Sequence, residues 1–233
     1  MMKRYSTLLL DADETLFDFL KAEQSSLKTV LSARGLPHDD EILQRYHVIN
    51  DALWHAFERG EITKEVIKKT RFARLAEQSG FPAGIDTDEI NSDYLRQLGE
   101  SDYLLPGARS FLQKLFDAGF DLALITNGVA KTQLRRLEKS GLAPLFSHVF
   151  VSETVGAQKP LPAFFDAVLR AIDEQDKARV LVIGDSLASD IRGADNAGLD
   201  CVWFNPKGKP NDDALPVTLE TRTYEEIEAF LGL

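Results

Sequence analysis

Three stretches of different hydrophobic pattern follow one another along the chain. The first is a short apolar run, residues 7–10, which ends abruptly in the acids Asp11 and Asp13. A run of this length that stops at charged residues is typical of a buried strand whose last residues reach the edge of a sheet. On an extended backbone, side chains two residues apart point to the same side, so we expect both carboxylates to face one way. A solvated turn with helix-capping acids is the alternative interpretation.

The second stretch, residues 17–103, has the spacing of amphipathic helices. Its longest apolar stripe recurs every three or four residues, with Asp39 or Asp40 as the N-cap. Shorter stripes precede and follow it, one beginning at the cap residue Thr63 and one ending at Gly99. No strand signal interrupts them, so we expect a bundle of four helices. The longest stripe consists of Ile42, Tyr46, Ile49, Leu53 and Phe57.

In the third stretch, short apolar runs alternate with helical stripes. Strands separated by helices of this length predict right-handed βαβ units and a parallel sheet covered on both faces. We expect strands at residues 120–126, 148–152, 180–184 and 201–204, and helices at residues 107–118, 130–140, 161–172, 191–197 and 224–231. Residues 206–210, which include two lysines, are expected to form a solvated loop.

These patterns together predict an α/β fold with a Rossmann-like parallel sheet. Residues 1–16 and 104–233 would form the core domain, and residues 17–103 an inserted helical cap domain. Because the insertion follows the first strand, we expect it to cover the sheet edge where Asp11 lies.

Composition narrows the classes of function. The chain has 233 residues, with 27 basic against 37 acidic side chains and a net charge of −10, and lacks the basic stripe of a nucleic-acid binder. Its single cysteine, Cys201, lies in a strand-like run and is interpreted as a buried apolar residue in a reducing compartment. No apolar run is long enough to span a membrane, and residues 1–4 lead straight into a strand. We therefore expect a cytoplasmic protein; the pattern does not indicate its oligomeric state.

Polar residues follow three further predicted strands. Thr126 and Asn127 come after the second strand, where a hydroxyl and backbone N–H groups can hold a phosphate or simply cap a helix. Lys159 follows the third strand, and taken alone it is typical of a surface charge. Asp185 and Asp190 follow the most apolar strand of the chain, where solubility is a poor explanation for two carboxylates.

Together these groups suit phosphoryl transfer. Asp11, Asp13 and Asp185 supply hard oxygen ligands, which favour Mg²⁺ because no histidine or thiolate cluster competes. Lys159 would neutralise phosphoryl oxygens that Thr126 helps to hold in line for attack. One aspartate can act as the nucleophile and another as the acid and base.

Four segments resemble, in order, the four motifs of the haloacid dehalogenase-like hydrolase superfamily. They are Asp11-Ala12-Asp13-Glu14-Thr15, Ile125-Thr126-Asn127-Gly128, Lys159-Pro160 and Gly184-Asp185 with Asp190. The resemblance implies that Asp11 is the nucleophile and Asp13 the acid and base. It also implies that Asp11, the Asp13 backbone carbonyl and Asp185 hold Mg²⁺ with support from Asp190, and that Thr126, Asn127 and Lys159 bind phosphate.

The helical stretch is similar to the cap of the bacterial pyrimidine 5′-nucleotidase group of that superfamily. The similarity lies in Asn50-Asp51-Ala52-Leu53-Trp54, Gly60-Glu61-Ile62-Thr63 and Thr70-Arg71-Phe72. It implies a small phosphorylated substrate, a pyrimidine nucleoside monophosphate. The residues alone establish no base pocket, since Trp54 and Phe57 suit a bundle core as well as a stacking surface. His47 and His55 are interpreted as ordinary helix residues.

Other activities on the same framework stay open. A phosphatase acting on sugar phosphates or phosphoglycolate would use the same core groups, and so would a phosphomutase. A 2-haloacid dehalogenase needs the nucleophile but no acid for a leaving alcohol, so Asp13 favours a phosphate ester. A signalling receiver domain would carry its phosphoacceptor on a later strand, and a catalytically idle binding protein would have little use for all four motifs.

Overall fold

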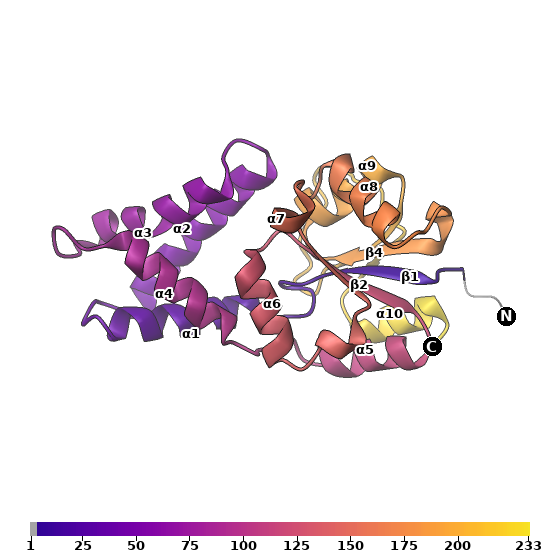
Figure 1. Ribbon diagram of the computed structural model, residues 1–233, viewed down its shortest axis with the longest axis horizontal. Helices are drawn as coiled ribbons and strands as arrows, with labels where there is room; N and C mark the ends of the chain where they lie inside the picture. Colours follow the sequence, from indigo (N-terminus) through magenta and orange to yellow (C-terminus); the bar gives the residue numbers. More distant parts are fainter. Residues whose placement is uncertain (1–3) are drawn as a thin grey trace. The chain divides into compact units, whose positions relative to one another are not determined.

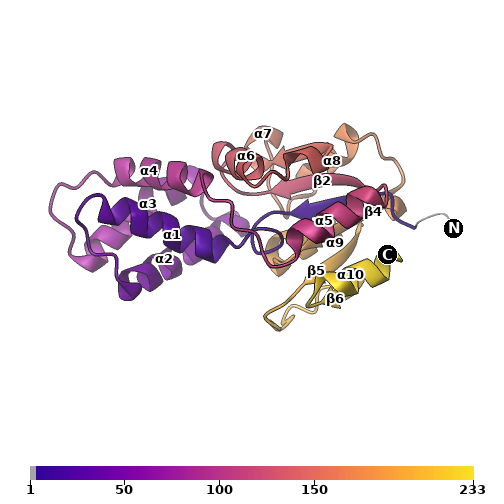
Figure 2. The ribbon, with the colours of Figure 1, turned by 90° about the horizontal axis from the view of Figure 1, so that it is seen from below.

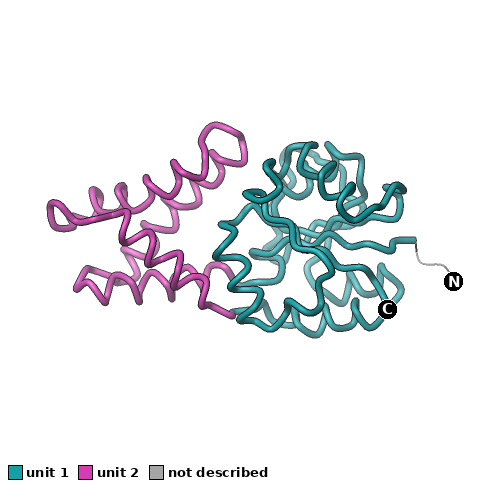
Figure 3. Tube along the Cα trace, viewed as in Figure 1, with its two compact units in different colours: residues 1–18, 103–233 teal, residues 19–102 magenta. Residues whose placement is uncertain are grey.

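The computed structural model describes residues 4–233, so most of the segment 1–4 that precedes the first predicted strand lies outside the described residues. The chain divides into two compact units, coloured separately in Figure 3. Residues 1–18 and 103–233 form the sheet unit, and residues 19–102 form the helical unit. No helix within residues 4–233 has the length and apolarity needed to cross a membrane.

The sheet unit is built on six parallel strands in the order β3-β2-β1-β4-β5-β6. Figure 1 labels β1, β2 and β4 of this sheet among the helices that cover it. The strands are β1 (Thr7–Asp11), β2 (Asp121–Thr126), β3 (His148–Val151), β4 (Val180–Gly184), β5 (Asp200–Phe204) and β6 (Leu219–Thr221). This order places β1 at the centre, where the direction of winding reverses. The predicted Rossmann-like fold class is thereby confirmed.

Both faces of the sheet are apolar because its strands are buried on both sides. In β1, Leu8 and Leu10 join one core cluster and Leu9 joins the other. The first cluster packs under α5 (Ala108–Asp117) and α10 (Tyr224–Leu231), and the second under α8 (Pro162–Ala171) and α9 (Arg192–Ala197) (Figure 1). Figure 2 shows α10 beside β6. The remaining pieces are α6 (Ala130–Lys139), α7 (Ser152–Val155), the 3₁₀ turns Ala143–Leu145 and Lys177–Arg179, and the π-helical turn Leu187–Ile191.

The helical unit consists of four helices, as predicted. They are α1 (Phe19–Ser32), α2 (Asp40–Glu58), α3 (Lys64–Ser79) and α4 (Thr87–Gly99). Each packs against two of the others, so that the unit closes into a bundle. The Asp39 side chain caps α2 by accepting from the Ile42 N–H at 3.0 Å, and Thr63 caps α3.

Strand β6 and helix α7, two of the short elements of the sheet unit, were not predicted. Strand β6 has only three residues and no apolar run, and it forms the sheet edge beside β5. Ser152, expected to end a strand, instead begins the short helix α7.

Phe17 belongs to the sheet unit because its ring is buried in the α5 and α10 cluster. Beside it, the Asp18 N–H donates to the Tyr103 carbonyl at 3.1 Å, which joins the two ends of the sheet unit's chain at this point.

Candidate active site

The carboxyl ends of three neighbouring strands bring the predicted residues to one edge of the sheet. Strand β1 pairs with β2 on one side and β4 on the other, with Asp11 opposite Ile125 and Leu10 opposite Ile183. Thr126 is the last residue of β2, and Asp185 directly follows β4. This edge lies at the point where the strand order reverses, which is where open α/β sheets bind ligands.

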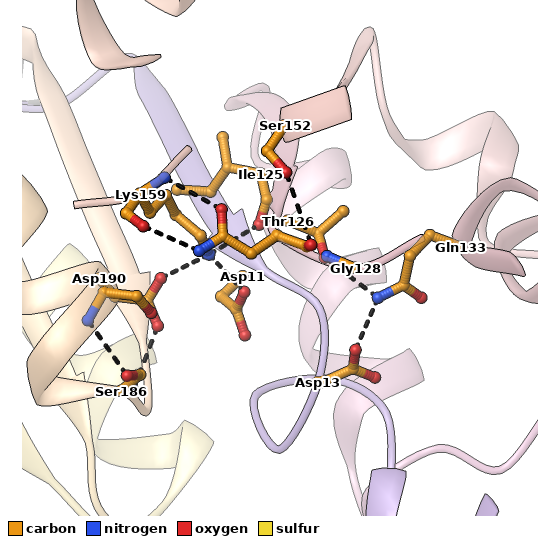
Figure 4. Close-up of polar contacts among 12 residues, drawn as sticks. Asp11, Asp13, Ile125, Thr126, Gly128, Gln133, Ser152, Lys159, Ser186 and Asp190 are labelled. Carbon is orange, nitrogen blue, oxygen red and sulfur yellow. Dashed lines mark hydrogen bonds and ion pairs between the residues drawn. The ribbon is translucent and has the colours of Figure 1, made fainter. Parts of the chain in front are cut away.

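Lys159 is the cation at the centre of this edge (Figure 4). Its Nζ donates to Asp11 Oδ1 and Asp190 Oδ1, both at 2.6 Å, and to the Ile125 carbonyl at 3.2 Å. Burial alone would lower the pKa of Lys159, but the negative charges of Asp11 and Asp190 outweigh it and raise that pKa. Lys159 is therefore a permanent positive charge beside the predicted nucleophile.

Asn127 fixes the backbone that carries this lysine. Its Nδ2 donates to the Lys159 carbonyl at 2.9 Å, and its Oδ1 accepts from the Lys159 N–H at 3.0 Å. The side chain predicted to bind phosphate is thus bonded to Lys159 on both its donor and its acceptor side. Its neighbour Thr126 accepts at Oγ1 from the Gly128 N–H at 3.0 Å.

Asp11, Asp185 and Asp190 form a carboxylate cluster. One oxygen of each lies within 4.8 Å of the others. Burial, followed by the charge of Asp190, raises the pKa of Asp11 well above its usual value and that of Asp185 to about 7. Lys159 balances only part of this charge. A hard divalent cation would supply the rest, and the all-oxygen donor set fits Mg²⁺.

Asp13 has different hydrogen-bond partners from Asp11. Strand β1 ends at Asp11, and Asp13 follows it in an isolated bridge to Phe17. From α6, Arg136 binds one carboxylate oxygen of Asp13, and Gln133 Nε2 donates to the other at 2.6 Å. Gln133 Nε2 also lies 3.0 Å from Thr126 Oγ1, so α6 ties Asp13 to the end of β2 (Figure 4).

The lysine loop, residues Asn205 to Lys209, follows β5 and also belongs to this edge. Residues 206–210 are exposed, which confirms the expected solvated loop. Two of its side chains also form ion pairs: Lys207 Nζ lies 2.7 Å from Glu14 Oε2, and Lys209 Nζ lies 3.4 Å from Asp185 Oδ2. Two cations from the loop thus face the acids that follow β1 and β4.

The helical unit holds a second polar cluster, buried among its own helices. Asn50 Nδ2 donates to Glu23 Oε2 at 2.9 Å, and Arg71 Nη1 donates to Asn50 Oδ1 at 3.4 Å. Arg71 Nε donates to Asn91 Oδ1 at 2.8 Å, and His47 Nδ1 lies 2.8 Å from Glu23 Oε1. His47 is therefore a member of this network rather than an ordinary helix residue.

The cap residues that carried the nucleotidase resemblance have structural contacts of their own. Asn50 and Arg71 belong to the network just described. Thr63 caps α3, and Trp54 meets the buried ring of Phe57 edge-on at 5.6 Å between centroids. Bundle packing accounts for these contacts.

Comparison with known proteins identifies the family. The family model of the haloacid dehalogenase-like hydrolases matches residues 5–198. The chain belongs to this family of hydrolases.

Relatives of this hydrolase match along its whole length. The HAD-hydrolase YfnB of Bacillus subtilis is 40% identical over 100% of this chain and 97% of its own, and its magnesium-bound crystal structure superimposes with a TM-score of 0.92 over 99% and 100% of the two chains. Pyrimidine 5′-nucleotidase PynA of Streptococcus pneumoniae is 36% identical over 96% and 93% of the chains. Pyrimidine 5′-nucleotidase YjjG of Escherichia coli is 31% identical over 98% of each.

The structure of this haloacid dehalogenase-like hydrolase adds site residues that sequence reasoning missed. Gln133 and Arg136 stand one helical turn apart on α6, and both are buried. The available signal was a pair of polar residues on the inward face of a helix that starts just after a candidate phosphate-binding turn. The roles of Lys207 and Lys209 could not be read from a sequence pattern, because their contacts with Glu14 and Asp185 form only when the strands assemble into the sheet.

Proposed function

We propose that this hydrolase is a Mg²⁺-dependent phosphomonoesterase that works through a phosphoaspartate on Asp11. The observation that carries the proposal is the buried Lys159, whose ammonium joins Asp11 to Asp190 at the convergent strand ends. A carboxylate beside a fixed cation can approach a phosphoryl group whose negative oxygens would otherwise repel it.

The reaction would proceed in two displacements. An Asp11 carboxylate oxygen bonds to phosphorus while the bond from phosphorus to the leaving oxygen breaks, and Asp13 gives that oxygen a proton. Asp13 then takes a proton from a water molecule whose oxygen bonds to phosphorus. The bond between phosphorus and the Asp11 oxygen breaks, which releases inorganic phosphate and regenerates the Asp11 carboxylate.

The surrounding residues would bind and orient the phosphoryl group. Lys159 neutralises its oxygens, Thr126 helps to hold them, and Asn127 keeps Lys159 in place through the two backbone hydrogen bonds. When bound by Asp11, the Asp13 carbonyl and Asp185, with Asp190 in support, Mg²⁺ would stabilise the charge on those oxygens. Arg136 and Gln133 position the acid and base, Asp13.

For the substrate we propose a pyrimidine nucleoside 5′-monophosphate, handled in the cytoplasm. Two full-length relatives are named pyrimidine 5′-nucleotidases, PynA and YjjG. The net charge of −10 disfavours polyanions, so nucleic-acid polymers should be poor substrates. The phosphate chemistry itself is indifferent to the alcohol, and sugar phosphates or phosphoglycolate are therefore the competing substrates.

A substrate panel tests the proposal. dUMP, dTMP and UMP are compared with AMP, GMP, glucose 6-phosphate, phosphoglycolate and 2-chloropropionate, each with Mg²⁺ and with EDTA. We expect phosphate release only with Mg²⁺ and the highest kcat/KM for a pyrimidine nucleotide. If a sugar phosphate or phosphoglycolate exceeds every pyrimidine nucleotide by about tenfold, a discrimination that one binding pocket readily provides, the nucleotidase assignment is wrong. Chloride release from 2-chloropropionate without phosphatase activity would overturn the phosphatase as well.

A further inference from the structure

The lysine loop after β5 is closed by one buried side chain. Asn205, 2% exposed, accepts from the Lys209 N–H at 2.8 Å through Oδ1 and donates to the Lys209 carbonyl at 2.9 Å through Nδ2. Its Nδ2 also lies 2.7 Å from Glu220 Oε1, and its N–H donates to the Thr221 carbonyl at 2.7 Å. The loop is therefore a defined turn tied to β6, and the Lys209 backbone is held at its end.

From this turn Lys209 reaches the edge of the carboxylate cluster. Its ammonium lies 3.4 Å from Asp185 Oδ2, and the Trp203 Nε1–H holds the Asp185 carbonyl at 3.0 Å. The Lys209 side chain is 53% exposed, whereas that of Asp185 is 17% exposed. Asp185 is thus the member of the carboxylate cluster that contacts the exposed ammonium of Lys209.

The two lysines that meet the cluster differ in how firmly they are held. Lys159 is buried and bonded to three oxygens, so its charge is a fixed part of the site. Lys209 has an exposed, flexible stem and a longer contact, so it can leave Asp185 at little cost. A dication that binds Asp185 would displace or face this ammonium.

We propose that Lys209 competes with the divalent cation for Asp185, so that the lysine loop lowers the affinity of the site for the metal. The inference rests on the proposed Mg²⁺ site. The ammonium repels a dication a few ångströms away and occupies the carboxylate that would bind it. Removal of this single charge should tighten Mg²⁺ binding about threefold to tenfold, as expected for a unit charge and a dication separated by about 6 Å near a solvated surface.

The test is calorimetric titration of Mg²⁺ into the metal-stripped full-length protein, with the Mg²⁺-dependent rise in Tm as a second readout. Lys209→Gln removes the competing charge, and Lys209→Arg retains it. Lys207→Gln is the matched control, because it removes the same charge from the same loop beside Glu14, which lies outside the carboxylate cluster.

We expect tighter Mg²⁺ binding for Lys209→Gln only, with the other two variants within about twofold of the wild type. Unchanged or weaker binding by Lys209→Gln would overturn the inference, since weaker binding would mean that Lys209 orients Asp185 for the metal. An equal gain in Lys207→Gln would also overturn it, because the effect would then come from net charge. Failure of the wild type to bind Mg²⁺ would instead overturn the metal part of the proposed function, and this inference with it.

Discussion

Asp11 and Asp13 are two residues apart, yet each has a separate set of partners. Asp11 is bonded to the buried ammonium of Lys159, whereas Asp13 is bonded to Gln133 and Arg136 of α6. Separate anchoring allows one carboxylate to attack phosphorus while the other moves a proton, because neither role depends on the other's hydrogen bonds. This division is the residue-scale basis of the proposed mechanism.

Asp13→Asn should slow formation of the phosphoenzyme unevenly across leaving groups. A nucleoside alkoxide needs a proton far more than p-nitrophenolate does, so we expect the larger loss with dUMP. Rapid-quench measurement of this step with both substrates checks the prediction, because overall turnover also includes a hydrolysis step that needs Asp13. Equal slowing for the two leaving groups would contradict the acid role.

At the scale of elements, α9 packs closely against α8 and the segment after β3. Gly193 allows this approach, since a Cβ there would lie 2.5 Å from Phe165 Cε2 and 3.2 Å from the Pro160 Cα. Pro160 directly follows Lys159, so we expect a shift of α9 to disturb the position of the ammonium.

Gly193→Ala should lower the free energy of unfolding by about 1–3 kcal/mol, the usual cost of forcing a methyl group into a packed contact. We also expect a lower kcat, because Lys159 would be displaced. Urea unfolding and steady-state kinetics are the measurements. Asp195→Ala, at an exposed position on the same helix, is the control. A Gly193→Ala protein as stable and as active as this control would show that the contact relaxes freely.

At the scale of the whole molecule, the sequence pattern predicted the features that depend on neighbouring residues, such as buried strands and helix caps. Strand β4 matches residues 180–184 because five consecutive residues are buried, and Asp39 and Thr63 are caps set by their own helices. Strand β6 escaped prediction because three residues on a sheet edge carry no period. Arg136 and Lys209, which contact Asp13 and Asp185, escaped prediction because they lie 123 and 24 residues away from these acids along the chain.

At the active site, the positions of residues could be predicted from sequence but their hydrogen bonds could not. Asp11, Lys159 and Asp190 were predicted as separate strand-end residues, and the sheet order brings them into direct contact. The side-chain bonds of Asn127 to Lys159 were not predicted, since they depend on how two loops meet. Strand ends can be located from sequence, but the hydrogen bonds between them come from packing.

Whether Asp11 is the nucleophile of a phosphatase is decided by the kcat/KM of Asp11→Asn with Mg²⁺ and dUMP or p-nitrophenyl phosphate. The amide is nearly isosteric with the carboxylate but is a poor nucleophile, so we predict a loss of at least about a thousandfold with an unchanged circular dichroism spectrum. Asp166→Asn, at an exposed position on α8, controls for the loss of one carboxylate charge and should retain wild-type activity. A folded Asp11→Asn enzyme with the kcat/KM of this control would show that Asp11 is not the nucleophile.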